Sequence, residues 1–224
     1  MPRLSNEDHD RVSAAISAAE EKSDGEIIAI AADQSDAYHD VGLHYAVLVL
    51  FLVLGWAAAC PNCLKWWFEL LMGGWRMEPT IRELLTFLLF LALLKFLAVL
   101  FILKWTPLRL FLTPGSTKTR RVRRRAVMLF KTGAERRTIG RTGILIYLSM
   151  AEHRAEIVAD EAITSVTTPE TWGEAMAALI TEVKAGRPCD GIVAAVEQIG
   201  VVLAEHFPKT SEDTNEIPDK LIEL

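Results

Sequence analysis

The stretch VGLHYAVLVLFLVLGWAAA (residues 41–59) contains no Asp, Glu, Lys or Arg. A second stretch, IRELLTFLLFLALLKFLAVLFIL (residues 81–103), carries only Arg82, Glu83 and Lys95 as charges. As α-helices the two would be about 28 and 34 Å long, enough to cross a hydrocarbon core of about 30 Å. Both are therefore predicted to be transmembrane helices that form a hairpin. A buried hairpin in a soluble protein is less favoured, because such helices seldom stay apolar on every face.

The charges of the 224-residue chain are unevenly distributed around a formal net charge of −5. Residues 1–40 hold ten acids and three Lys or Arg, unlike a secretory signal. Residues 104–141 hold twelve of the 24 basic residues, whereas residues 60–80 hold two. The positive-inside rule places such a basic flank in the cytoplasm. We therefore expect a multi-pass protein of the bacterial inner (plasma) membrane with both termini cytoplasmic.

A run of arginines follows the second apolar stretch in KTRRVRRR (residues 118–125). Each basic side chain near an anionic leaflet contributes on the order of 1 kcal/mol to membrane attraction. Nucleic acid is not expected as a partner, because the run lacks interleaved aromatic residues and the chain is acidic overall. The residues predicted to contact lipid headgroups are Arg120, Arg121, Arg123, Arg124 and Arg125.

The polar parts of the chain have the pattern of an α/β domain. The runs EIIAIAA (26–32), GILIYLS (143–149) and RAEIVA (154–159) are predicted strands, and the last two are close enough to form an antiparallel hairpin. The first is expected to pair parallel with the second through a crossover that includes the basic helix, which makes the sheet mixed. Amphipathic helices are predicted over 4–22 and 117–131, and after Thr168 and Asp190.

The hairpin is thus predicted to interrupt one domain. The predicted boundaries are 1–40 and 105–208 for the two parts of the α/β domain, 41–59 and 81–104 for the transmembrane helices, 60–80 for a short extracytoplasmic loop and 209–224 for a flexible acidic tail. In the loop, Cys60 and Cys63 have the spacing of a redox pair or half a zinc site, or they close a small disulfide. The loop tryptophans suit the headgroup region, or a surface that docks another membrane protein.

Several segments together resemble the TPM domain family. They are residues 141–149 (RTGILIYLS), residues 152–158 (EHRAEIV), the opening strand at DGEII (24–28), and DGI (190–192) at the start of the last helix. The resemblance extends over most of 5–33 and 117–207, and bacterial membrane-anchored TPM domain proteins are the most similar. It implies a compact αβα sandwich and, from plant members, acid phosphatase activity with a bound divalent metal. The chain departs from many members at residues 160–163, which contain no Gly, and this argues against carrying the activity over.

Carboxylates, Glu26 among them, cluster at one predicted sheet edge, where strands 26–32 and 143–149 begin and strand 154–159 ends. Asp24, Asp160, Glu161 and, from a helix start, Asp190 are candidate ligands of a hard cation such as Ca²⁺ or Mg²⁺. Arg141 beside them is a candidate phosphate-binding residue. The alternative is that Asp190 caps its helix and the others are solvated strand ends.

Two functions follow from these patterns. The first is a membrane-tethered binding or regulatory module for envelope proteins, with the hairpin contacting a membrane-protein partner. The second is a divalent-metal-dependent phosphatase acting on phosphomonoesters. The chain contains no nucleophile elbow, P-loop, Rossmann fingerprint or HExxH pair, so established catalytic signatures do not choose an enzyme class.

Overall fold

The computed structural model describes residues 4–72, 78–133, 142–210 and 219–224. They form two compact units, one of Met1–Asp36 with Gly115–Leu224, the other of Ala37–Pro114. The second unit is therefore inserted in the first, as the sequence predicts. It ends later than the predicted transmembrane segment, because the short helix α5 (Thr106–Leu112) also belongs to it.

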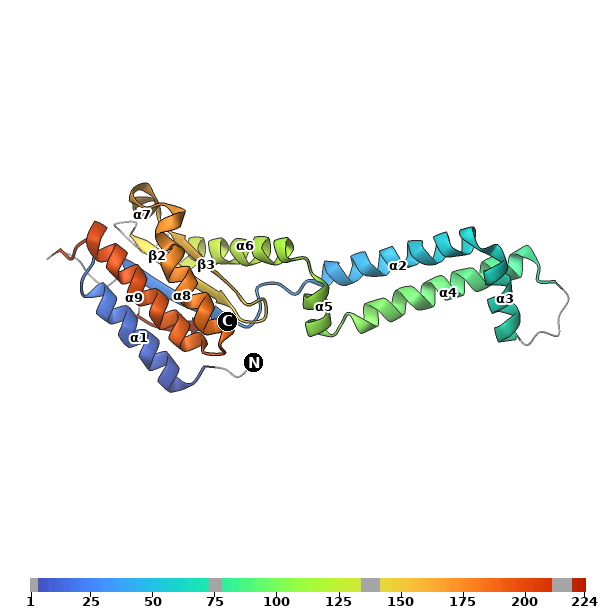
Figure 1. Ribbon diagram of the computed structural model, residues 1–224, viewed down its shortest axis with the longest axis horizontal. Coiled ribbons are helices and arrows are strands. Elements are labelled where there is room, and N and C mark those ends of the chain that lie inside the picture. Colours follow the sequence, from blue (N-terminus) through green and yellow to red (C-terminus); the bar gives the residue numbers. More distant parts are fainter. Residues whose placement is uncertain (1–3, 73–77, 134–141, 211–218) are drawn as a thin grey trace. The chain divides into compact units, whose positions relative to one another are not determined.

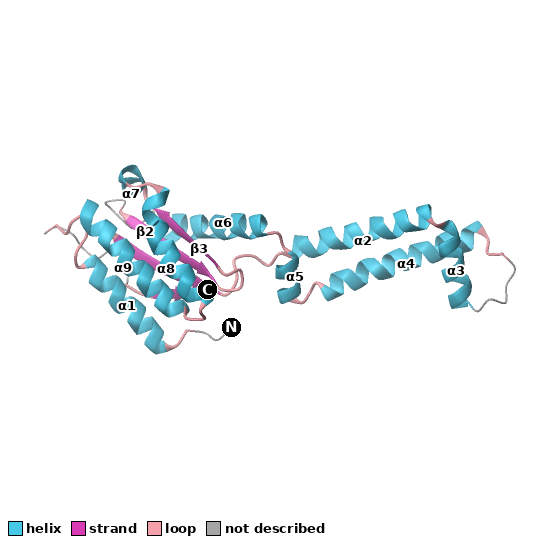
Figure 2. Cartoon of the chain, viewed as in Figure 1, coloured by secondary structure: helices cyan, strands magenta, loops and turns pink. Residues whose placement is uncertain are grey.

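The first unit is built on a four-stranded mixed sheet with the order β3-β2-β1-β4. Figure 2 draws its strands in magenta. Strand β1 (Glu26–Ala32) runs parallel to β2 (Gly143–Ser149), with Glu26 opposite Gly143. Strand β3 (Arg154–Ala159) is antiparallel to β2. These three strands and their pairings confirm the predicted mixed sheet. Every residue of β1 and β2 is buried, which explains why both runs are almost continuously apolar.

The end of the chain forms a fourth strand. The sequence predicted a flexible tail, and this is wrong for β4 (Leu221–Glu223), which pairs parallel with Ala29–Ala31 of β1. Leu221 lies in the core, and the Leu224 N–H donates to the Ala31 carbonyl at 3.0 Å. The strand covers part of an edge of β1 whose backbone groups would otherwise lack partners. Three residues are too few to give a recognisable period in the sequence.

Helices cover both faces of the sheet (Figure 1). Because side chains alternate along a strand, one face carries Ile27, Ala29 and their equivalents, and the other carries Ile28 and Ile30. The first face packs on α1 (Asn6–Glu20), α8 (Gly173–Lys184) and α9 (Pro188–His206). The second packs on α6 (Gly115–Gly133). This confirms the αβα sandwich. The short α7 (Glu161–Val166) and the 3₁₀ turn Pro169–Trp172 lead from β3 to α8.

The second unit contains two long apolar helices, α2 (His39–Ala59) and α4 (Ile81–Ile102), which pack on one another. Few of their residues are buried, and most of these are small, such as Gly42, Ala46 and Ala92. Between them, α3 (Pro61–Met72) lies where the sequence predicted a loop. The three helices and α5 make a unit whose large apolar side chains are mainly exposed.

Candidate functional site

Buried polar side chains form a connected network where β1 and β2 end. Ser35 Oγ lies 3.0 Å from Tyr147 Oη and donates to Ser149 Oγ at 2.8 Å. Ser149 Oγ donates to one carboxylate oxygen of Glu152, and the other accepts the Ser35 N–H at 2.9 Å. Tyr147 and Ser149 are fully buried and Glu152 is 6% exposed. We call these four residues the Ser35–Glu152 network.

Strand geometry and a tight turn bring the network together. Tyr147 and Ser149 are two residues apart on β2, so both side chains point to the face that α6 covers. The turn after β2 is tied to the segment after β1, because the Ala151 N–H donates to the Asp33 carbonyl at 3.0 Å. His153 closes the turn in the left-handed conformation, with φ 50°. The turn thereby places Glu152 beside Ser35.

The network acts as a clamp on the segment that follows β1. Burial, reinforced by the Glu152 carboxylate, raises the pKa of Tyr147, so its phenol stays protonated. Hydrogen bonds between buried groups of this kind stabilise one arrangement of the chain, because breaking any of them leaves a buried group without a partner. The segment that they fix, up to Asp36, is the last part of the first unit before the inserted unit begins.

An ion pair connects this segment to the point where the chain returns. Arg121 on α6 approaches Asp36 to 3.0 Å, and Arg124 approaches the same carboxylate oxygen to 3.7 Å. Helix α6 begins at Gly115, the first residue after the inserted unit. Asp36, the last residue of the first unit before the insertion, is thus paired by charge with the helix that follows the insertion.

The five arginines predicted to contact lipid have different surroundings. The Arg121 side chain is 16% exposed and the Arg124 side chain 78% exposed, although both face Asp36. Burial raises the pKa of Glu156, and the positive charge of Arg123 partly offsets this rise. The positive charge of Arg125 likewise partly offsets the rise in the pKa of Tyr147. The exposed members of the set are Arg120, Arg123 and Arg124.

Part of the predicted carboxylate cluster lies at one sheet edge. Thr142 Oγ1 donates to the Asp24 carbonyl at 2.9 Å, and the Asp160 N–H donates to the Gly143 carbonyl at 2.9 Å. The Asp24 carboxylate, however, accepts hydrogen bonds from Thr210, at 2.7 Å from its N–H and 2.8 Å from its hydroxyl. Asp160 is the buried N-cap of α7, and Glu161, which follows it, is exposed.

Another predicted member of the carboxylate cluster, Asp190, is not placed at this sheet edge. Asp190 lies in the first turn of α9 and accepts a hydrogen bond from the Arg11 guanidinium at 2.7 Å. The Asp24 N–H instead donates to the Phe207 carbonyl, at the other end of that helix. The rise of an α-helix separates these ends by about 25 Å. Arg141 lies outside the described residues. No three or more His, Cys, Asp or Glu side chains within the described ranges are grouped so as to hold a metal ion. The prediction that Asp190 joins the edge cluster is therefore wrong.

A second acidic cluster contains Glu26, which was predicted at the sheet edge, together with Glu20 and Asp219, which were not predicted. Glu20 and Glu26 are 7% and 5% exposed and line a pocket of about 230 Å³ with Asp219, which we call the acidic pocket. The Ile27 N–H donates to Glu20 at 2.7 Å. A signal was present in the sequence, because Glu20 continues the buried stripe of Val12 and Ile16 at a spacing of four residues. Such a position predicts a buried carboxylate.

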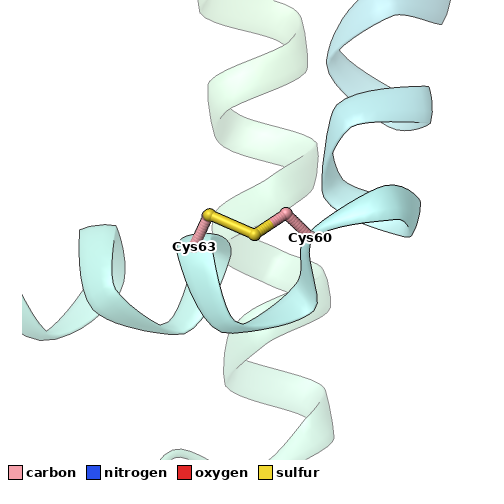
Figure 3. Close-up of a disulfide and its surroundings, with 2 residues drawn as sticks. All are labelled: Cys60 and Cys63. Carbon is pink, nitrogen blue, oxygen red and sulfur yellow. A yellow bond between two sulfur atoms is a disulfide. The ribbon is translucent and has the colours of Figure 1, made fainter.

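The inserted unit has its own distinctive region at α3. Cys60, at the end of α2, and Cys63 form a disulfide that pins the start of α3 (Figure 3). This is one of the alternatives that the spacing left open. A groove of about 650 Å³ lies between α3 and α4, and the Phe68 and Phe87 rings make an edge-to-face contact there, with centroids 5.5 Å apart. We call this the α3–α4 groove.

Comparisons with known proteins agree with this architecture. The NMR structure of BA42 protein from the psychrophilic bacterium Bizionia argentinensis is similar, with a TM-score of 0.57 and 17% sequence identity over 100% of this chain and 97% of that chain. This similarity shows the shared fold. No curated protein sequence matches the chain significantly. The family model described as the TPM domain matches residues 111–202, which include α6, β2, β3 and most of α9. The chain therefore carries a TPM domain, matched over residues 111–202, and the α/β unit that contains it is divided by an apolar helical unit.

Proposed function

We propose that the protein is an integral protein of the bacterial inner membrane that holds its TPM domain at the cytoplasmic face as a binding or regulatory module for envelope proteins. The observation that carries the proposal is the pair of helices α2 and α4. At 21 and 22 residues they are about 31 and 33 Å long, enough for a bilayer core of about 30 Å.

The surface of these helices supports a lipid environment. A core helix of a soluble protein is mostly buried, yet Phe90 and Phe101 on α4 are 72% and 74% exposed. The buried residues between α2 and α4 are mainly Gly and Ala, the small residues that let helices approach closely in membranes. The exposed arginines of α6 favour the cytoplasmic side for the TPM domain by the positive-inside rule.

The clamp at the junctions supports a binding or regulatory role. The Ser35–Glu152 network and the Arg121–Asp36 pair fix the segment that precedes the insertion to the end of the sheet and to α6, the helix that follows the insertion. A phosphatase with a bound divalent metal, the alternative that the family resemblance implies, would need a ligand set, and the described carboxylates are not grouped to supply one. Hydrolysis of a generic phosphomonoester by the full-length protein, lost in Asp160→Asn, would favour the phosphatase instead.

Alkaline carbonate extraction of membranes that contain the full-length chain tests the proposal. We expect the protein to stay in the membrane pellet and to dissolve only in detergent, because peripheral attachment through charge would be broken by high pH. Recovery of the chain in the carbonate supernatant as a folded monomer would contradict it. Affinity purification in mild detergent would then test for a stoichiometric membrane-protein partner.

A further inference from the structure

The α3–α4 groove combines a polar end with a long apolar floor. Residues that face it from α4 recur at helical spacing from Arg82 to Leu94, a distance of about 18 Å along the helix. The polar ones, Arg82, Glu83 and Thr86, come from the first turns of α4. All later ones are apolar, namely Phe87, Phe90, Leu91 and Leu94, and α3 adds Phe68, Leu71 and Met72. This is the distribution of polarity in an amphiphile.

The apolar floor is wide and open. Leu71, Met72 and Phe90 are all more than half exposed, and the volume of about 650 Å³ falls within the range of about 300–1,000 Å³ for small-molecule sites. Exposed apolar surface of this kind marks an interaction site or a lipid contact. In a unit proposed to cross a bilayer, the molecules that surround the groove have acyl chains.

One charge at the polar end is available to a ligand. The Glu83 carboxylate accepts hydrogen bonds from the Thr80 N–H and hydroxyl, both at 2.9 Å, and so belongs to the cap of α4. Arg82 is exposed and forms no ion pair with the residues that the structure describes around it. A guanidinium suits the planar, bidentate recognition of a phosphate group.

The depth of this end suits a lipid headgroup. Arg82 is the second residue of α4, so in a spanning helix it lies at the boundary between hydrocarbon and water. The neighbouring α3 presents Trp66 and Trp67, residues that favour the same interfacial layer. A phosphate at Arg82 and a chain running toward Leu94 would therefore follow the direction of a lipid in the bilayer.

We propose that the α3–α4 groove is a specific phospholipid site, in which Arg82 binds the phosphate and one acyl chain lies along Phe87–Leu94. The site rests on the proposed membrane insertion, but it goes beyond it. Insertion alone requires only a shell of exchanging lipid, whereas this site retains one lipid molecule whose binding depends on Arg82.

Native mass spectrometry of the full-length protein, purified in mild detergent, tests the site. We expect one retained phospholipid per chain in the unaltered protein and about a tenfold lower occupancy in Arg82→Gln, the order of effect of losing one charged hydrogen-bond contact of about 1.4 kcal/mol. Lys104→Gln is the matched control, because it removes a cation just after the far end of α4, outside the groove, and should keep the lipid. Leu94→Trp, which narrows the apolar end, should lower occupancy as well.

The possible outcomes distinguish failure of the lipid site from failure of the proposed membrane insertion. Equal lipid occupancy in Arg82→Gln and the unaltered protein, or a protein that resists carbonate but retains no phospholipid, would overturn the site and leave insertion standing. Release of the lipid by millimolar inorganic phosphate would mean that only the phosphate group is recognised, and would overturn the proposed role of the acyl chain. A lipid-free dimer joined through α3 would show that a second copy fills the groove, and would also overturn it.

Discussion

Glu20→Gln should stabilise the TPM domain at alkaline pH and have little effect in acid. Glu20 ends α1 against the start of β1, where burial raises its pKa from 4.5 to about 9, with the nearby charges of Glu26 and Asp219 adding to the effect. At neutral pH the folded protein therefore holds a proton that the unfolded chain has released. Gln has the same shape and can still accept the Ile27 N–H, but it does not titrate.

The sign and size of this difference in unfolding free energy follow from proton linkage. A raised carboxyl pKa does not destabilise the folded state below about pH 4.5, because Glu20 is then protonated in both the folded and the unfolded protein. As pH rises from about 4.5 to about 9, the free energy of unfolding falls by up to about 1.4 kcal/mol per pH unit. Over the interval from about pH 4.5 to pH 7 this would amount to about 3 kcal/mol, and because Glu20 lines a pocket, solvent screening is expected to reduce the difference to about 2 kcal/mol.

Urea unfolding of the full-length protein in detergent, followed by amide hydrogen exchange in peptides from α1 and β1, measures this difference. Glu20→Gln should exceed the unaltered protein in unfolding free energy by about 2 kcal/mol at pH 7 and match it near pH 5. Glu21→Gln is the matched control, because Glu21 lines the same pocket but is exposed, and it should show no pH-dependent gain. A difference between Glu20→Gln and the unaltered protein that is the same at both pH values would refute the reasoning.

Three further predictions concern the clamp, the helix packing and the basic helix. Glu152→Gln should lower the free energy of unfolding of the TPM domain by about 1–3 kcal/mol in the same urea assay, because the buried hydrogen bonds from Ser35 and Ser149 lose a carboxylate acceptor. A methyl group added at Gly200 would lie 2.8 Å from Ala19 Cβ, so Gly200→Ala should cost about 1 kcal/mol, and adding Ala19→Gly should recover stability; a double variant no better than Gly200→Ala would contradict this packing argument. Replacing Arg120, Arg123 and Arg124 together with Gln should produce a population with inverted topology, detected by a reporter after Leu224, and a reporter that stays fully cytoplasmic would count against the positive-inside argument.

The sheet could be predicted from sequence because its strands are long, apolar and bounded by turns. Strand β2 begins at Gly143, and its pairing with β3 follows from the short turn before Arg154. The parallel pairing of β1 with β2 follows from the long crossover between them. Strand β4 could not be found in this way, because its three residues gain their stability from the free edge of β1, a feature of the assembled sheet.

The polar sites were predicted less well, because their partners come from distant parts of the chain. Asp24 and Asp160 were correctly brought to one edge, but which side chains they contact depends on Thr210 and on the start of α7. The Ser35–Glu152 network lies at the opposite edge, and Ser149 at the end of an apolar strand is its one local signal. Helix α3 was missed because its apolar face suited a loop in the headgroup region equally well.

Protease protection of a doubly tagged full-length chain tests the central claim most directly. One tag follows Leu224, and the other is inserted between α3 and α4, after residue 77. If α2 and α4 cross the bilayer with the TPM domain in the cytoplasm, protease should cut the first tag only in inside-out vesicles and the second only in right-side-out vesicles. Cleavage of both tags from the same side would contradict it, because an apolar hairpin that does not span the membrane leaves the connection between α3 and α4 in the same compartment as the TPM domain.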